Sequence, residues 1–263
     1  MNGCGPDGST FSLSVLVVDD NEVNRLYLFH ALRRMGHVAV VAEDGTRAIE
    51  LFRLQPFDLV LMDIQLPDMD GLSLTRAIRG GQAGTVNRPD VPIVALTAFA
   101  SRDDRNRSLA AGMNDHLSKP VSAADIAAAI QRLLGRPEAQ RAAAPPPAPA
   151  DFDLAGLTRE SGREFVTEIL QLFLELAEPK RQALIQAVSR GDIVAAAPLA
   201  HDLAGMAGPI RARQLHRAMK ALQEACGAGS LEACRSGHAA ADRELAAVLA
   251  AVRAHPYLAG GPA

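Results

Sequence analysis

The first half of the chain alternates short apolar runs with amphipathic segments, and this alternation constrains the fold more than any other feature. The apolar runs are too short for helices and read as buried strands, whereas the segments between them show helical periodicity. The expected strands are residues 14–18, 38–41, 58–62, 93–96 and 116–118, and the expected helices are 22–35, 44–54, 72–79, 103–111 and 122–134. Such βα alternation predicts an α/β domain, a doubly wound five-stranded parallel sheet with helices on both faces.

The second half shows no strand pattern. Apolar residues recur at helical spacing from Phe165 to Val188, and amphipathic segments follow at residues 193–207, 211–225 and 230–253. Short connections between such helices favour an antiparallel arrangement, so we expect an all-α four-helix bundle. Pro179 and Pro198 fall inside two of these helices and are expected to kink them.

A segment rich in proline and alanine, GRPEAQRAAAPPPAPA, separates the two halves. It lacks apolar periodicity, and this composition favours an extended, semi-rigid linker. We therefore expect a first domain at residues 12–134, a linker at 135–150 and a helical domain at 151–255.

The composition excludes several classes of protein. A net charge of −3 gives no general attraction to nucleic acid, and no basic recognition helix is present. No apolar stretch is long enough to cross a bilayer, so no membrane contact is expected of this chain. The cysteines number three and lack metal-ligand spacing, which indicates a reducing compartment and a cytoplasmic location. Cys226 and Cys234 could pair, although buried thiols are the favoured interpretation.

Polar residues stand at four of the expected strand ends. Ligands of an open parallel sheet bind beyond the carboxyl ends of its strands, where Asp19, Asp20, Asp63, Thr97 and Lys119 would meet. Three converging carboxylates repel one another, and a hard divalent cation such as Mg²⁺ relieves that repulsion. The cation and the lysine would hold a phosphoryl group, with Asp63 as the nucleophile. The pattern predicts phosphoryl transfer by positioning and charge neutralisation.

Each of these residues alone has an ordinary structural explanation. An aspartate that follows a strand is often a helix N-cap, and Asp20 alone would be such a cap as often as not. A single lysine or threonine at a strand end carries little information. All four strand ends together, in order, favour the functional interpretation.

The motifs at these strand ends carry a family resemblance. LVVDDNEVNR, DLVLMDIQLPDMDG, PIVALTA and HLSKP resemble a response-regulator receiver domain of the kind found in hybrid histidine kinases, over residues 12–134. The resemblance implies a flavodoxin-like fold and a role in bacterial two-component signalling. It also implies that Asp63 accepts the phosphoryl group and that the Lys119–Pro120 peptide bond is cis.

The same resemblance implies further roles at this site. Mg²⁺ would be bound directly by Asp20, Asp63 and the carbonyl of Gln65, and through water by Asp19. Thr97 and Lys119 would contact the phosphoryl group. The chain departs from the family at its switch pair, Thr97 and His116, because His116 stands where the family usually has Tyr or Phe. Phe99 could fill some of the same space.

One histidine stands out in the helical half. His201 lies in PLAHDLAGMAGPI among small residues, which leave its imidazole open to a partner, and an accessible neutral imidazole is a good nucleophile. The other histidines are interpreted as ordinary surface or core residues. Residues 153–253 resemble a histidine phosphotransfer (HPt) domain, whose His-x-Leu-Lys-Gly motif reads HDLAG here. Ala204 replaces the usual lysine and Arg211 a later glycine, and Arg211 or Arg213 could supply the missing charge.

These patterns lead to a phosphorelay intermediate. A sensor or hybrid histidine kinase would phosphorylate Asp63, and His201 would exchange phosphoryl with Asp63 or with the aspartate of a downstream response-regulator receiver. Conventional enzyme turnover is left uncertain. In the alternative hypothesis, the bundle is a degenerate, non-phosphorylated interaction module that docks a kinase or effector under the control of the receiver.

Overall fold

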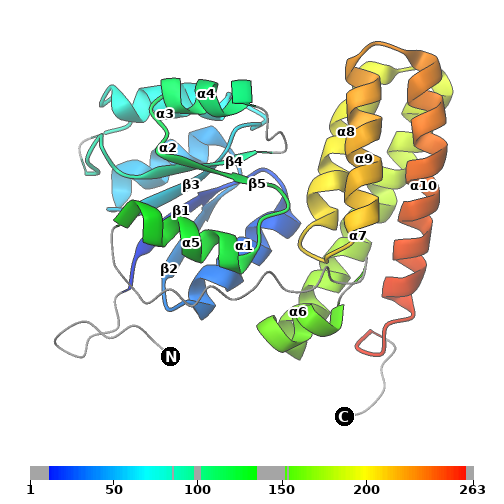
Figure 1. Cartoon of the computed structure of the whole chain (residues 1–263), viewed down its shortest axis with the longest axis horizontal. Helices are drawn as coiled ribbons and strands as arrows, with labels where there is room; N and C mark the ends of the chain where they lie inside the picture. The colour runs from blue at the N-terminus through cyan, green and yellow to red at the C-terminus, as the bar shows by residue number, and fades with distance from the viewer. Residues whose placement is uncertain (1–11, 85, 98–101, 135–151, 153, 259–263) are drawn as a thin grey trace. The chain divides into compact units, whose positions relative to one another are not determined.

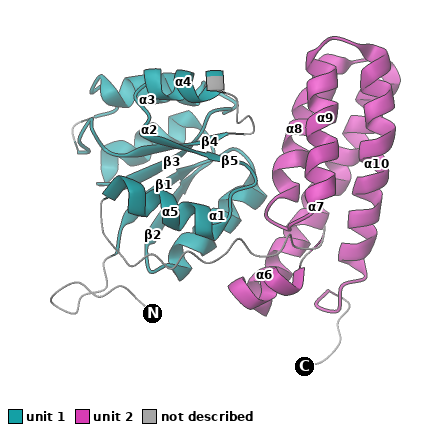
Figure 2. Ribbon diagram, viewed as in Figure 1, with its two compact units in different colours: residues 1–144 teal, residues 145–263 magenta. Residues whose placement is uncertain are grey.

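The computed structural model describes residues 12–84, 86–97, 102–134, 152 and 154–258. The expected linker and Phe99 lie outside these residues. The chain divides into two compact units, Met1–Ala144 and Pro145–Ala263, which are described separately (Figure 2).

The first unit is built on a parallel sheet of five strands in the order β2-β1-β3-β4-β5. The strands are β1 (Ser14–Val18), β2 (Val38–Ala42), β3 (Leu59–Asp63), β4 (Ile93–Thr97) and β5 (Asp115–Ser118). The helices between and after them are α1 (Glu22–Arg34), α2 (Gly45–Leu54), α3 (Gly71–Arg79), α4 (Arg102–Ala110) and α5 (Ala123–Leu134). The predicted doubly wound sheet is confirmed.

Helices cover both faces of the sheet (Figure 1). One core joins α2 and α3 to the sheet through buried side chains such as Phe52, Leu74 and Val60. On the other face α1 and α5 lie together, and the Tyr27 hydroxyl accepts a hydrogen bond from the Ala123 backbone N–H at 3.1 Å. β3 and β4 are buried along their whole length because helices cover both faces of the sheet, and their residues are apolar up to the terminal Asp63 and Thr97.

Local capping fixes where the helices begin. The N-cap of α1 is Asn21, whose Oδ1 accepts a hydrogen bond from the Asn24 backbone N–H at 3.2 Å. Asp20 therefore does not have the capping role that the structural explanation offered for it. Asp44 and Asp70 cap α2 and α3 in the same manner.

The second unit contains five helices among the described residues: α6 (Leu154–Ser161), α7 (Arg163–Arg190), α8 (Ile193–Ala207), α9 (Arg213–Gly227) and α10 (Leu231–Arg253). The four long helices confirm the predicted bundle, and Pro179 and Pro198 lie inside α7 and α8. The short α6 was not predicted. Its sequence is too brief to show periodicity, and it is held by buried Leu154 and Leu157 and by an ion pair of Glu160 with Arg211.

The two cysteines of the bundle, Cys226 and Cys234, are buried and free, as the favoured interpretation predicted. In the described part of the chain, no helix has both the length and the apolarity that crossing a membrane demands.

Candidate functional site

The sheet brings polar residues together at the carboxyl ends of four strands. Asp63 and Thr97 are the last residues of β3 and β4, Asp19 and Asp20 follow β1, and Lys119 follows β5. Carboxylate oxygens of the three aspartates lie within 4.8 Å of one another. The structure therefore gathers the strand-end residues on which the sequence argument rested.

A buried lysine lies inside this acidic cluster. Lys119 Nζ is 2.8 Å from Asp19 Oδ2 and also donates to Asp63 Oδ2, with only 9% of its side chain exposed. Burial disfavours the charged lysine, but Asp19 and Asp63 outweigh that effect, so the pKa of Lys119 is raised. The Lys119 backbone N–H donates to the Thr97 carbonyl at 2.7 Å, and the Lys119–Pro120 bond is cis, as the resemblance implied.

Asp63 is a buried carboxylate with a strongly shifted pKa. Only 2% of the residue is exposed, and burial raises its pKa to about 6. Lys119 opposes this rise and the charge of Asp19 adds to it. Asp19 is held in place by the Asn21 backbone N–H, which donates to its Oδ1 at 2.9 Å. Lys119 pairs with two of the three carboxylates, and carboxylate oxygens gathered this closely suit a divalent cation.

The loop after β3 shapes one wall of the site. The Gln65 backbone N–H donates to Asp63 Oδ1 at 3.1 Å. The backbones of Gln65 and Asp70 form an isolated antiparallel β-bridge. Gly71 closes the loop, since its N–H donates to the Ile64 carbonyl at 2.9 Å. A Cβ at position 71 would collide with the Asp63 carbonyl oxygen, so the close approach requires glycine.

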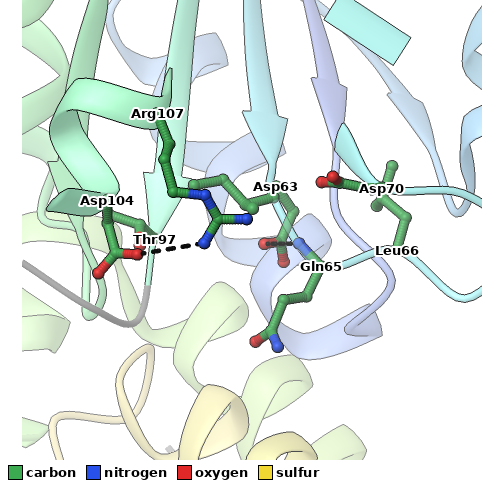
Figure 3. Close-up of a pocket in the computed structure, with 8 residues that line it drawn as sticks. Asp63, Gln65, Leu66, Asp70, Thr97, Asp104 and Arg107 are labelled. Carbon is green, nitrogen blue, oxygen red and sulfur yellow. Dashed lines mark hydrogen bonds and ion pairs between the residues drawn. The ribbon is translucent and has the colours of Figure 1, made fainter. Parts of the chain in front are cut away.

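An open cleft of about 480 Å³ lies over Asp63. Figure 3 shows Asp104 and Arg107 of α4 on its rim, opposite the loop that carries Gln65 and Leu66. Sequence reasoning missed these two residues, because α4 is polar nearly all round and its sequence does not show which of its charges face the strand ends.

The second candidate residue lies in the middle of α8. His201 is half-buried, and its Nδ1 is 3.4 Å from Oε1 of Gln223 on α9. An amide oxygen only accepts, so Gln223 Oε1 pairs with the ring when Nδ1 carries the proton, and the neutral form of that tautomer has its lone pair on Nε2. The neighbouring Asp202 pairs with Lys180 of α7. The contact with α9 thus fixes one side of the half-buried imidazole. Sequence reasoning missed Gln223.

Family models match both units. The model described as "Response regulator receiver domain" matches residues 15–131, and the model described as "Hpt domain" matches residues 168–255. This chain carries a receiver domain followed by an Hpt domain. The resemblance read from the strand-end motifs and from HDLAG is thereby confirmed.

The curated relatives are much longer chains. Sensor protein GacS of Pseudomonas syringae pv. syringae is 35% identical over 76% of this chain, and histidine-protein kinase BarA of Escherichia coli K12 is 28% identical over 77%. The chain spans only 23% and 22% of those two relatives.

A structure of one isolated receiver domain is also similar. The receiver domain of a sensor histidine kinase from Pseudomonas aeruginosa PAO1, whose crystal structure holds magnesium in the active-site cleft, is 40% identical. The match covers 48% of this chain and 100% of that domain, with a TM-score of 0.43.

The receiver domain differs from its family at the expected switch residue. His116 lies on β5, and its Nδ1 is 3.7 Å from Oδ1 of Asp115. Arg132 of α5 binds the other oxygen of Asp115 at 2.7 Å. The imidazole therefore lies beside a carboxylate that α5 already holds. A switching role for Thr97 and His116 stays a prediction.

The Hpt domain differs at the usual lysine. Ala204 is only 5% exposed, and its carbonyl accepts a hydrogen bond from His216 Nδ1 at 2.8 Å. The lysine position is thus covered where α9 packs on α8. Arg211, one of the two suggested replacements, has a φ of 60° and pairs with Glu160 of α6. Arg213 is exposed at the start of α9.

Proposed function

We propose that the chain is a phosphorelay intermediate in which Asp63 and His201 are the phosphoryl acceptors. The observation that carries this proposal is the cluster of three carboxylates with a buried Lys119 at the strand ends. Such a cluster suits a transferred phosphoryl group, because its catalysis consists of positioning and charge neutralisation. The proposed parts are the receiver at 12–134, the linker at 135–150 and the Hpt domain at 151–255, with a cytoplasmic location.

The residues of the cluster fit magnesium. Asp20, Asp63 and the Gln65 carbonyl would bind Mg²⁺ directly, and Asp19 would bind it through water. Oxygen donors of this kind suit a hard cation, and the excess of carboxylates over ammonium favours a divalent one. Bound magnesium supplies positive charge to the phosphoryl oxygens during transfer.

In the first step a carboxylate oxygen of Asp63 attacks the phosphorus of a kinase phosphohistidine. The new P–O bond forms as the P–N bond of the donor breaks, and the donor imidazole keeps the electron pair. Lys119 and Thr97 would hold oxygens of the phosphoryl group. The kinase is proposed to be a sensor or hybrid histidine kinase.

In the second step Nε2 of His201 attacks the phosphorus of an aspartyl phosphate, and the P–O bond to the aspartate breaks. Gln223 would keep the proton on Nδ1 and so keep Nε2 nucleophilic. The aspartate is Asp63 or that of a downstream response-regulator receiver. The chemistry runs in either direction, so the partners set the direction of transfer.

The difference in stability of the two phosphoryl bonds gives a direct test. The full chain is incubated with Mg²⁺ and radiolabelled acetyl phosphate, with and without a partner receiver. Alkali-labile label reports aspartyl phosphate, and acid-labile, alkali-stable label reports phosphohistidine. We expect Asp63→Asn to remove the alkali-labile label and His201→Gln to remove the alkali-stable label only.

Two outcomes would contradict the proposal. If the Asp63→Asn variant is labelled as strongly as the unmodified chain, the assignment of Asp63 as the acceptor is wrong. Absence of alkali-stable label with every cognate phospho-receiver would instead support the alternative, in which the bundle docks a kinase or effector without being phosphorylated.

A further inference from the structure

Arg107 is a cation of the cleft to which the proposed function gives no role. It lies on α4 and lines the cleft together with Asp63, Gln65 and Thr97 (Figure 3). Its side chain is 68% exposed, and its Nη1 is 3.8 Å from Asp104 Oδ1. The guanidinium therefore lies at the mouth of the cleft and is held only loosely by Asp104, because the arginine is mostly exposed and the separation exceeds that of a hydrogen bond.

Phosphorylation would change the charge of this cleft. An aspartyl phosphate at Asp63 would carry about two negative charges, beside those of Asp19 and Asp20. A divalent cation and Lys119 compensate most of this charge and leave about one negative charge unbalanced. The planar fork of a guanidinium matches two phosphoryl oxygens and is suited to that remaining charge.

We propose that Arg107 turns from Asp104 to bind the phosphoryl group on Asp63 and so stabilises the phosphorylated receiver. This inference rests on the proposed phosphorylation of Asp63. Leaving Asp104 costs little, because the pair is longer than a hydrogen bond and the arginine side chain is mostly exposed. Arg107 would thus make the α4 rim of the cleft respond to the state of Asp63.

The experiment measures a phosphoryl mimic and not turnover. Beryllium trifluoride is titrated into the full chain with saturating Mg²⁺, and bound fluoride is followed by fluorine-19 NMR. That signal is used because the chain has no tryptophan to report binding. We expect Arg107→Ala to weaken binding about three- to tenfold, and Arg107→Lys to weaken it less.

A matched control is available on the same helix. Arg105 is exposed and is not part of the cleft lining, so Arg105→Ala removes the same charge from α4 without touching the site. We expect it to change affinity less than about twofold. Asp104→Asn should tighten binding by releasing Arg107, and the gain should shrink in an Arg107→Ala background.

The outcomes separate this inference from the proposed function. If the unmodified chain, like Asp63→Asn, does not bind the mimic, the proposed acceptor is wrong. If the chain binds it but Arg107→Ala has no effect, or has the same effect as Arg105→Ala, only the role of Arg107 is overturned.

Discussion

The two proposed phosphoryl sites of this chain are built in opposite ways. In the receiver, Asp63 is buried between other carboxylates and pairs with Lys119, whose charge is locked inside the cluster. In the Hpt domain, His201 is half-buried on a helix and has one amide contact, to Gln223. The receiver thus gathers several charged groups in one cluster, whereas the bundle offers a single half-buried histidine.

This difference has a physical consequence for how the sites work together. A receiver that docks on His201 would bring its own metal and lysine, so most charge in the transition state would be neutralised from the receiver side. That explains how an Hpt domain with Ala204 in place of the usual lysine can still be proposed to transfer phosphoryl. The substitutions described next test this contrast between the two sites.

The largest effect is expected at the proposed metal. Asp20→Ala should weaken Mg²⁺ binding by roughly two orders of magnitude, because it removes a direct carboxylate ligand. Isothermal titration of the full chain measures this. Asp103→Ala removes an exposed carboxylate of α4 and should leave the affinity nearly unchanged, as should His201→Gln. An unchanged affinity in Asp20→Ala would contradict the ligand assignment.

The buried charge of Asp63 should affect the free energy of unfolding of the receiver. Because the folded state raises its pKa from 3.8 to about 6, the folded receiver binds the proton more tightly than the unfolded chain. Stability should therefore fall as pH rises through that window. In EDTA at pH 7.5, Asp63→Asn should stabilise the receiver by about 1–3 kcal/mol. Lys119 would still have its ion pair with Asp19 in this variant.

Chemical denaturation at two pH values measures this effect. The gain should be much smaller at pH 4, where Asp63 is mostly protonated. His201→Gln should change neither value beyond about 0.5 kcal/mol. A destabilised Asp63→Asn at pH 7.5 would mean that the contact with Lys119 outweighs burial and repulsion.

An ion pair between Arg181 of α7 and Asp242 of α10 contributes electrostatic stability to the bundle. Arg181 Nε is 2.7 Å from Asp242 Oδ1, and this hydrogen bond lowers the pKa of Asp242. Its contribution is present at neutral pH and is lost as pH falls through that lowered pKa. Asp242→Asn should destabilise the bundle at pH 7 by about 1–2 kcal/mol.

Thermal unfolding of the variant checks this expectation. The receiver transition should not move, and the difference between variant and parent should vanish in strong acid. Glu224→Gln, an exposed change in the same bundle, serves as the control. If both variants lose the same stability, the pair linking α7 to α10 has no special role.

The smallest effect is expected at Gln223. Replacing it with alanine should slow transfer to His201 about three- to tenfold, because the imidazole loses one positioning hydrogen bond but keeps its nucleophilic nitrogen. Rapid-quench transfer from a phosphorylated receiver measures the rate. Glu224→Ala is the neighbouring exposed control. Complete loss of transfer would show that Gln223 does more than orient the ring.

Much of the fold was predictable because its signals are local. Strand and helix periods and the helix starts at Asp44 and Ser122 all act within a few residues of the chain. The meeting of Asp19, Asp63 and Lys119 was also predictable, since parallel strands end on one edge of a sheet. The extra helix α6 was not predicted, because its eight residues are stabilised by packing against the bundle and not by a local sequence signal.

The sequence by itself determined the two fold classes, the strand-end cluster and His201 as the candidate histidine. Only the tertiary structure decided which α9 residue faces His201, that Ala204 is covered, and that Arg107 lines the cleft over Asp63. The reason is geometric. A helical period shows which residues share a face, but the rotation and register of one helix on its neighbour depend on contacts between residues far apart in the chain.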